Sequence, residues 1–284
     1  MPVIENNPYI NKIHVLDKKL KSIIPSLKAE NFDHIIDLHK NIRSVFIRMQ
    51  LRKPSSSFPK LNFKKWLYIY FRINLLPKIH IVDRYFKAAR FLRLENDGKG
   101  LDYFLNSEED KLPEDIPSPF HSHYVGFVIG GKHRTKILPT EKIISICKKI
   151  KKPIILLGGQ EDKIKGEIIR ETSGSHVFNA CGRFSINQSA FLVKNADSII
   201  THDTGLMHIA AAYKKKIISV WGNTIPDFGM YPYLPEEFKD RSSIFEIKKL
   251  SCRPCSKLGY KECPAGHFKC MQLIDEDGIA AKIN

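Results

Sequence analysis

The chain has 284 residues, of which 43% are hydrophobic and 27% are charged. This composition is typical of a folded globular protein and excludes the disordered and fibrous classes. There are 46 Lys and Arg residues against 30 Asp and Glu residues, and the resulting net charge of +16 favours anionic partners. Because the basic residues are scattered and no zinc-finger, RNA-recognition or helix-turn-helix signature is present, we do not expect a nucleic-acid partner.

The sequence shows neither a secretory signal nor a membrane span. No run of 18 uncharged apolar residues occurs, so no segment is predicted to cross a bilayer. Residues 1–8 lack the basic region and the apolar core of a secretory signal. We therefore expect a cytoplasmic protein.

The first half of the chain alternates irregularly between predicted helices and strands. Apolar periodicity predicts a helix over 22–31, a strand over 34–38 and a helix over 82–94. Residues 110–119 hold three prolines and three acids, which is typical of a linker. We therefore divide the chain into an N-terminal domain, residues 1–119, and a C-terminal domain, residues 120–284.

Residues 58–76 are rich in aromatic and basic side chains and have two interpretations. In one, the segment lies on an anionic membrane face with Trp66, Tyr68 and Tyr70 at the level of the headgroups. In the other, it is a core helix with a solvated basic side. We favour the core helix, because apolar residues nearly encircle the segment.

The second half is regular. Predicted helices of about 10–13 residues separate its strands, which indicates βαβ units, a parallel sheet and right-handed crossovers. In such sheets ligands bind beyond the carboxyl ends of the strands. The strands are expected at 124–130, 153–157, 176–178, 197–201 and 216–221, and the helices at 140–150, 162–172, 185–195 and 205–213. Polar or glycine-rich turns that follow four of these strands therefore share one edge: Gly130-Gly131, Gly158-Gly159, Asp203-Thr204-Gly205 and Gly222-Asn223.

The turn after the strand at 197–201 is the strongest candidate for a ligand site. A strand, a tight turn and a helix N-terminus follow one another, and free N–H groups with the helix dipole attract anions there. Gly205 lets the backbone approach a ligand closely, Asp203 can accept hydrogen bonds from a sugar, and His208 lies one turn into the helix. The pattern predicts a phosphate-bearing, hydroxyl-rich ligand such as a nucleotide sugar. The alternative is a purely structural junction, which is common in α/β proteins.

Motifs in both halves resemble glycosyltransferase family 9, the lipopolysaccharide heptosyltransferases. They are D-L-H-x-N-x-R-S at 37–44, K-I-L-P at 136–139, L-L-G-G-Q-E at 156–161 and H-D-T-G-x-x-H-x-A-A at 202–211. The resemblance implies an α/β fold of the GT-B type, in which two Rossmann-like domains with parallel sheets face each other across a cleft. It also implies transfer of heptose or a related sugar from ADP-heptose to a lipopolysaccharide core acceptor, with inversion and without a metal cofactor.

The resemblance assigns donor-binding roles to six residues. Asp203 would accept hydrogen bonds from sugar hydroxyls, and Glu161 would bind the ribose. The leaving diphosphate gains negative charge in the transition state, so a lysine, backbone amides and a helix N-terminus are suited to oppose it. The alternative for the lysine is one solvated side chain among many. The diphosphate contacts fall on Lys136, Thr204, Gly205 and His208.

The N-terminal motif supplies the expected acceptor side of the cleft. Asp37, His39, Asn41 and Arg43 follow a predicted strand end. Arg43 suits a phosphate or carboxylate on an anionic, lipid-linked acceptor. In the alternative interpretation, Asp37 and Arg43 form a structural ion pair.

The start of the chain departs from the family pattern. Family members begin with a strand and a glycine-bearing loop that carries an acidic catalytic base, whereas here residues 7–15 match a later segment. We therefore expect an incomplete N-terminal domain that lacks one or two βα units, an exposed sheet edge and low solubility. The catalytic base is unassigned, with Asp37 and His39 as candidates.

The C-terminal tail is rich in cysteine. Its four cysteines and His267 can be interpreted as a structural zinc site, as packed free thiols, or as a disulfide or redox cluster. Cys147 and Cys181 lie apart and are predicted to be buried packing residues. The candidate zinc ligands are Cys252, Cys255, Cys263 and Cys270.

Four further points concern the donor, the activity, the membrane and the tail of the chain. The donor could be a UDP- or GDP-sugar, since these loops do not reveal the base. The chain could also be a non-catalytic nucleotide-sugar-binding remnant or a partner subunit. The basic surface would help the protein to approach the inner membrane as a peripheral protein, and residues 272–283 are expected to cross back to the first domain as a helix.

Overall fold

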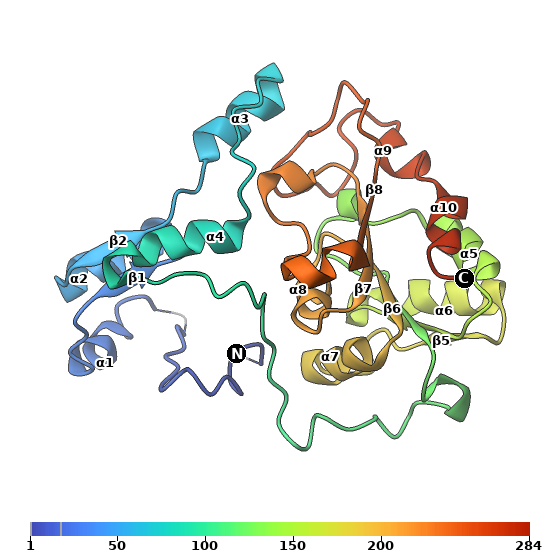
Figure 1. The fold of residues 1–284 in the computed structure, drawn as a ribbon, viewed down its shortest axis with the longest axis horizontal. Coiled ribbons are helices and arrows are strands. Elements are labelled where there is room, and N and C mark those ends of the chain that lie inside the picture. Colours follow the sequence, from blue (N-terminus) through green and yellow to red (C-terminus); the bar gives the residue numbers. More distant parts are fainter. Residues whose placement is uncertain (1, 18) are drawn as a thin grey trace.

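The computed structural model describes residues 2–17 and 19–284, which form two lobes joined by a long stretch without strands (Figure 1). The two strands of the N-terminal lobe pair in parallel, with Ile35 opposite Ser55. The helices expected near 22–31 and 82–94 and the strand near 34–38 are present, although the last helix continues as a 3-10 turn over Lys87–Leu92. The elements are α1 (Ile24–Ala29), β1 (Ile35–Asp37), α2 (Ile42–Leu51), β2 (Ser55–Ser57), α3 (Asn62–Phe71) and α4 (Ile81–Phe86).

The C-terminal lobe is built on a six-stranded parallel sheet with the order β5-β4-β3-β6-β7-β8. The chain runs outward from β3 in one direction and then from β6 in the other, so the strand order reverses between these two strands. Crevices at such a reversal are where open α/β sheets bind ligands. The strands are β3 (Val125–Val128), β4 (Ile154–Leu157), β5 (Val177–Asn179), β6 (Ser198–His202), β7 (Lys216–Trp221) and β8 (Ser242–Glu246). The helices are α5 (Thr140–Lys149), α6 (Lys163–Ser173), α7 (Ile186–Asn195), α8 (Gly205–Ala212), α9 (Lys269–Gln272) and α10 (Glu276–Ala281).

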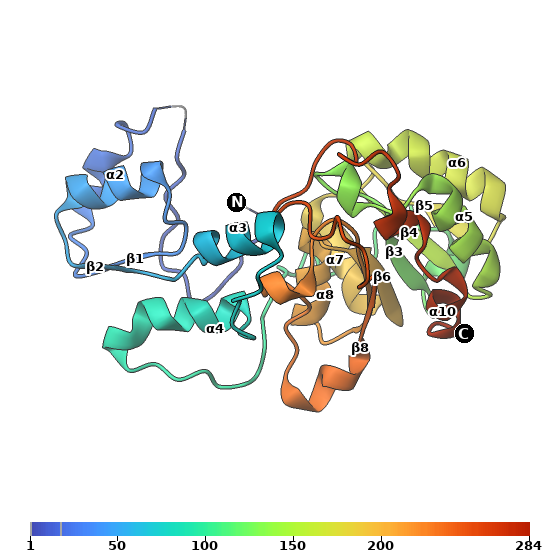
Figure 2. The ribbon, with the colours of Figure 1, turned by 90° about the horizontal axis from the view of Figure 1, so that it is seen from above.

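Helices cover both faces of this sheet (Figure 2). Alternate side chains of each strand point to opposite faces, so Phe127 packs with α5, α6 and α10 whereas Val128 packs with α7 and α8. All four residues of β3 and of β4 are buried. Because both faces are buried, these strands are unbroken apolar runs in the sequence, which is why the sequence predicts them well.

The structure departs from the sequence-based expectations at two elements of this lobe. The strand β8 was not expected, because its residues are half-exposed at the sheet edge and show no apolar run. The tail helix α10 does not cross to the first domain. It packs on α5 of its own lobe, where Lys142 Nζ lies 2.7 Å from Glu276 Oε1 and Asn284 Nδ2 donates to Lys149 O.

The interpretation of residues 58–76 as a core helix is also wrong. No residue of α3 is buried, and the side chain of Phe63 is 69% exposed. The helix contacts the C-terminal lobe through one side only, where Arg72 Nη1 donates to Pro254 O at 2.8 Å. A helix that is apolar nearly all round becomes a core helix only if other elements pack against several of its sides. Helix α3 has packing neighbours on one side.

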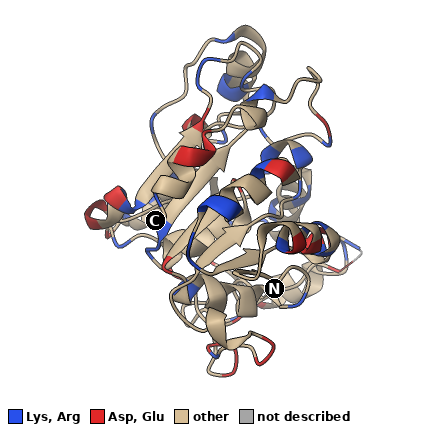
Figure 3. Ribbon diagram, turned by 90° about the vertical axis from the view of Figure 1, so that its right-hand side faces the viewer, with Lys and Arg blue, Asp and Glu red and all other residues tan. Residues whose placement is uncertain are grey.

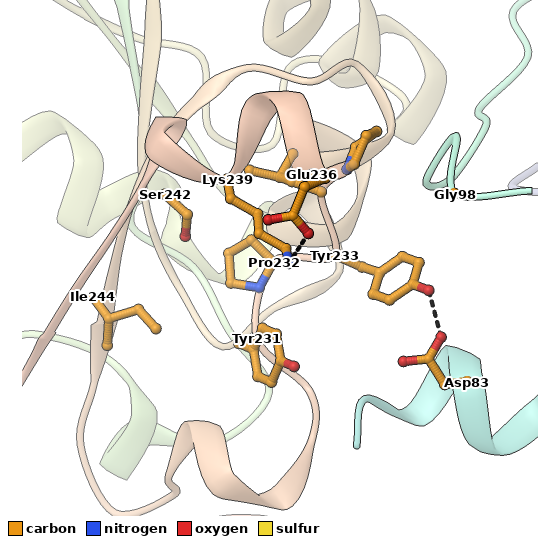
Figure 4. A pocket seen from close by; sticks show the side chains of 11 residues that line it. Asp83, Gly98, Tyr231, Pro232, Tyr233, Glu236, Lys239, Ser242 and Ile244 are labelled. Carbon is orange, nitrogen blue, oxygen red and sulfur yellow. Dashed lines mark hydrogen bonds and ion pairs between the residues drawn. The ribbon is translucent and has the colours of Figure 1, made fainter. Parts of the chain in front are cut away.

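The two lobes meet where α4 approaches the segment after β7. His80 Nε2 lies 2.9 Å from Tyr231 O, and Ile81 N donates to Gly229 O at 2.8 Å. The Tyr233 hydroxyl donates to Asp83 Oδ1 at 2.5 Å, as Figure 4 shows. This junction borders a cavity of about 500 Å³ that none of the predicted site residues lines. Hydrogen bonds from both lobes thus hold their relative orientation.

Basic side chains lie on many helices and loops (Figure 3). Among residues 2–17 and 19–284, no helix combines the length and the apolar character that a bilayer span requires.

The junction predicts a graded effect of glycine substitution. Gly229 has φ +79°, and a Cβ there would lie 2.8 Å from Ile79 O and 3.1 Å from Arg84 Nη2. Gly98 also has a positive φ, +72°, but open space around it. We expect Gly229→Ala to cost about 1–3 kcal/mol more than Gly98→Ala, because only the first also overpacks the junction. Thermal unfolding of the two variants measures the difference, and equal losses would contradict the role given to this contact.

Candidate active site

The turn between β6 and α8 leaves a helix N-terminus open. Thr204 is the N-cap residue, but its side chain makes no capping hydrogen bond. A Cβ added at Gly205 would meet nothing within 4 Å, so the backbone can be approached closely there. Free N–H groups in an open helix N-terminus form a site for an anion such as a phosphate.

An ion pair stands next to this N-terminus. Lys136 Nζ lies 2.6 Å from Asp203 Oδ2, and the Thr224 hydroxyl donates to the same oxygen at 3.0 Å. Lys136 comes from the turn after β3 and Asp203 from the turn after β6, so the pair bridges the point where the strand order reverses. Burial lowers the pKa of His208, with Asp203 opposing and Lys136 adding to that shift. The structure thus brings together five of the six predicted donor-binding residues: Lys136, Asp203, Thr204, Gly205 and His208.

A glycine-lined cavity of about 590 Å³ lies on the other side of the helix N-terminus. Its walls include Glu161, Thr204, and the turns after β3 and β4 at Gly130-Gly131 and Gly158-Gly159. A Cβ at Gly130 would approach Asp162 Oδ2 to 2.2 Å, so this turn has no room for a side chain. Three of the four turns predicted to share one edge of the sheet therefore line one crevice, whereas the turn at Gly222-Asn223 does not line it.

The second cavity, about 410 Å³, lies between the lobes and contains Lys136 and Asp203. Its N-terminal wall includes His39, Lys60 and Lys65. Burial, with Arg84 and Lys257 nearby, lowers the pKa of Lys65 to about 8, while Asp203 opposes this shift. Besides His39, the ionisable side chains of this cavity are five Lys and Arg residues and one carboxylate, a balance that suits an anionic ligand: Lys60, Lys65, Arg84, Lys136, Lys257 and Asp203.

Four of these cations were not predicted from the sequence. Lys60, Lys65, Arg84 and Lys257 are single basic residues in a basic chain, and nothing in their local pattern marks them. One signal was available for Lys60 and Lys65: they lie in a stretch, residues 38–82, that contains no Asp or Glu.

Of the residues predicted for the acceptor side, Asp37 has a structural role in its own turn. Asp37 Oδ1 accepts hydrogen bonds from His39 N and Lys40 N, and Asp37 Oδ2 accepts one from the Ser44 hydroxyl. Burial alone would raise the pKa of Asp37, but these hydrogen bonds and the nearby Arg48 guanidinium hold it below its ordinary value. This carboxylate therefore organises the turn at the end of β1, and its ion pair is with Arg48 rather than Arg43.

The other three members of the motif differ in exposure and contact. Asn41 caps α2, accepting from Ser44 N at 2.9 Å in a capping box. Arg43 is exposed on α2. His39 is exposed and lines the cavity between the lobes, so it is the one residue of the predicted acceptor set placed there.

The tail cysteines do not present a metal-ligand group. Across the part of the chain that the structure describes, no three or more His, Cys, Asp and Glu side chains are placed to hold a metal ion. The close pair is Cys252 Sγ and His267 Nε2, 3.7 Å apart. Cys147 and Cys181 are fully buried, as predicted.

A model described as glycosyltransferase family 9 (heptosyltransferase) matches residues 20–263 of the chain. Lipopolysaccharide heptosyltransferase 1 of Campylobacter coli is 26% identical over 246 residues, which cover 78% of this chain and 72% of that protein. Lipooligosaccharide heptosyltransferase 2 of Haemophilus ducreyi is 36% identical over 81 residues, or 26% of this chain and 23% of that protein.

Two solved structures share the fold. The glycosyltransferase of family 9 from Veillonella parvula DSM 2008 superposes with a TM-score of 0.74 at 20% identity, covering 99% of this chain and 83% of that one. The E. coli ADP-heptose lps heptosyltransferase II gives a TM-score of 0.66 at 17% identity, covering 94% and 80%. These similarities confirm the predicted α/β fold of the GT-B type.

Two buried histidines predict how stability depends on pH. Burial lowers the pKa of His202 to about 3 and that of His80 to about 4. Both are therefore neutral when folded, whereas both bind a proton in the unfolded chain below pH 6.5. The unfolded state then binds more protons, so the free energy of unfolding should fall by up to about 1.4 kcal/mol per pH unit per histidine below pH 6.5.

Thermal unfolding between pH 7.5 and 4.5 checks this. Leu138 N donates to His202 Nε2 at 3.0 Å, a bond that a glutamine oxygen can also accept. We expect His202→Gln to lose less stability on acidification than the wild-type chain. His123→Gln is the matched control because the His123 side chain is 87% exposed, and identical pH slopes in all three proteins would refute the assignment.

Proposed function

The chain belongs to glycosyltransferase family 9, and we propose that it transfers heptose from ADP-heptose to a lipopolysaccharide core acceptor with inversion at the anomeric carbon. The observation that carries this proposal is the Lys136–Asp203 ion pair beside the open N-terminus of α8. A glycine-lined crevice lies on one side of that N-terminus and the cavity between the lobes on the other.

This layout suggests an order for the parts of the donor. The nucleoside occupies the crevice, where Glu161 would bind the ribose hydroxyls. The diphosphate lies at the amides of Thr204 and Gly205, where the dipole of α8 opposes its charge. The sugar then enters the cavity between the lobes, where Asp203 can accept from its hydroxyls. His208 stands behind the diphosphate, one turn into the helix.

The same groups would assist the chemistry. When the bond from the anomeric carbon to the phosphate oxygen breaks, the leaving diphosphate gains negative charge, which Lys136 and the α8 amides oppose. Asp203 positions Lys136, because it holds the ammonium at 2.6 Å before substrate arrives. Inversion requires the acceptor hydroxyl to attack from the side opposite the leaving group, which is the N-terminal wall of the cavity.

A base must take the proton of the acceptor hydroxyl. Of the two candidates, Asp37 is occupied by hydrogen bonds within its turn, whereas His39 lines the cavity. We therefore keep His39 as the candidate base. The cationic lining of the cavity supports an anionic, lipid-linked acceptor, and we place the reaction at the cytoplasmic face of the inner membrane.

Calorimetric titration with ADP-heptose, a UDP-sugar and a GDP-sugar tests the donor assignment. We expect selective binding of ADP-heptose, and Lys136→Ala should weaken it by about 1.5–3 kcal/mol, roughly 10- to 150-fold in Kd. Lys148→Ala is the control because Lys148 is exposed on α5, away from both cavities.

Other outcomes of the titration are informative. If a UDP- or GDP-sugar binds more strongly than ADP-heptose, that sugar nucleotide becomes the assigned donor in place of ADP-heptose. No binding of any donor by a folded sample would overturn the donor site and favour a non-catalytic remnant or partner subunit. ADP-heptose binding without transfer to a core acceptor would leave the donor site intact and contradict the catalytic role.

The structural zinc predicted for the cysteine tail needs a separate test. Metal analysis of the purified protein should find about one equivalent if the four thiolates rearrange around zinc, and chelation should then lower the thermal midpoint. Less than about 0.2 equivalents of any metal would end this prediction in favour of packed thiols.

A further inference from the structure

The N-terminal lobe contains a long segment of one charge. Residues 38–82 include no Asp or Glu, while Lys and Arg recur along the whole stretch. Helix α3 lies within it. A surface built from such a segment attracts anions and repels a second copy of itself. The ten basic residues are Lys40, Arg43, Arg48, Arg52, Lys53, Lys60, Lys64, Lys65, Arg72 and Lys78.

One face of α3 carries a cluster of exposed aromatic rings, which we call the aromatic face: Phe63, Trp66, Tyr70 and Phe71. Their exposed fractions are 69%, 45%, 66% and 57%. Trp66 is the centre of the cluster, with ring centroids 5.9 Å from Phe63, 5.7 Å from Tyr70 and 5.2 Å from Phe71. The chain after the helix extends this apolar surface, because Leu75 is 53% exposed.

The opposite side of α3 is held against the C-terminal lobe. Arg72 Nη1 donates to Pro254 O at 2.8 Å, and Lys65 Nζ lies 5.2 Å from the centroid of the Phe228 ring. These contacts fix the rotation of the helix about its axis, so the aromatic face points away from the rest of the molecule. Lys65 and Asn62 also line the cavity between the lobes. One helix therefore borders the candidate active site on one side and presents aromatic rings to the outside on the other.

We propose that the aromatic face of α3 docks the protein onto an anionic lipid bilayer. Tryptophan and tyrosine rings suit the boundary between headgroups and acyl chains, where one end of the side chain is apolar and the other is wet. Exposed Lys64 and Lys78 lie in and next to the helix and complement anionic headgroups. A dimer through this face would bring two acid-free, basic segments together, so a second copy of the chain is disfavoured.

Docking through α3 would place the cavity between the lobes close to the headgroups. A lipid-linked acceptor could then reach the Lys136–Asp203 pair without leaving the bilayer. This consequence rests on the proposed function, whereas the docking itself does not. The two are separable, because vesicle binding needs no sugar donor and donor binding needs no lipid.

The two tryptophans of the chain provide the measurement. Trp66 is 45% exposed on the aromatic face, whereas Trp221, the last residue of β7, is fully buried. Vesicles of phosphatidylcholine mixed with phosphatidylglycerol should shift the emission of Trp66 to shorter wavelength. Vesicles of phosphatidylcholine alone should do so far less, and added salt should weaken the effect. Trp66→Phe should abolish the shift while leaving vesicle sedimentation largely intact.

The variants follow from the geometry. Phe63→Ser with Tyr70→Ser should lower partitioning onto the anionic vesicles at least tenfold, and Lys64→Ala with Lys78→Ala should remove the preference for phosphatidylglycerol. Ile164→Ser is the matched control, because Ile164 is 78% exposed on α6 in the other lobe. Circular dichroism verifies that each variant is folded, and ADP-heptose titration verifies that the donor site is unchanged.

Three results would overturn the proposal. Vesicle binding that does not depend on phosphatidylglycerol would remove the electrostatic argument. If the wild-type chain, the double serine variant and the Ile164→Ser control partition equally onto the vesicles, the protein docks through a surface other than the aromatic face. If the emission of Trp66 moves to shorter wavelength as the protein concentration rises in the absence of lipid, the aromatic face mediates self-association. Vesicle binding with no donor binding would instead refute the proposed function and leave the docking intact.

Discussion

Burial of both faces of the parallel sheet is the constraint on which the rest of the C-terminal lobe depends. Helices α5, α6 and α10 cover one face and α7 and α8 the other, so no ligand can approach the strands from the side. Polar groups can then gather only beyond the strand ends, and the parallel direction brings those of β3, β4, β6 and β7 to one edge. The crevice, the open N-terminus of α8 and the Lys136–Asp203 pair are all consequences of that arrangement.

The second constraint is the junction between the lobes. Backbone groups of α4 and of the segment around Gly229 pair directly, and Tyr233 reaches across to Asp83. This contact closes one side of the cavity and brings the cations of the N-terminal lobe opposite Asp203. Five of the 46 Lys and Arg side chains thereby converge where a leaving diphosphate and an anionic acceptor would meet, while the others remain spread over the surface. Helix α3 borders this cavity with one side and exposes its aromatic rings on the other.

The sequence predicted the site best where local chemistry determines the structure. The turn at 203–205 follows the end of β6 and leads into α8 as expected. The role of Asp37 could not be predicted from local sequence. Its carboxylate could have faced a substrate or its own turn, and only the folded geometry, with three hydrogen bonds and Arg48 nearby, distinguishes the two.

By itself, then, the sequence determined the positions of the buried strands along the chain, the glycine-rich turns after them and the family to which the chain belongs. These features are local: an apolar run forms a strand that is covered on both faces, and a small residue is needed wherever the backbone turns tightly. The tertiary structure alone decided the half-exposed edge strand β8, the packing of α10 on α5, the exposure of α3 and the convergence of Lys60, Lys65, Arg84 and Lys257 on one cavity. Each of these depends on which surfaces, distant in the chain, come into contact, and a pattern along one segment does not specify its neighbours in space.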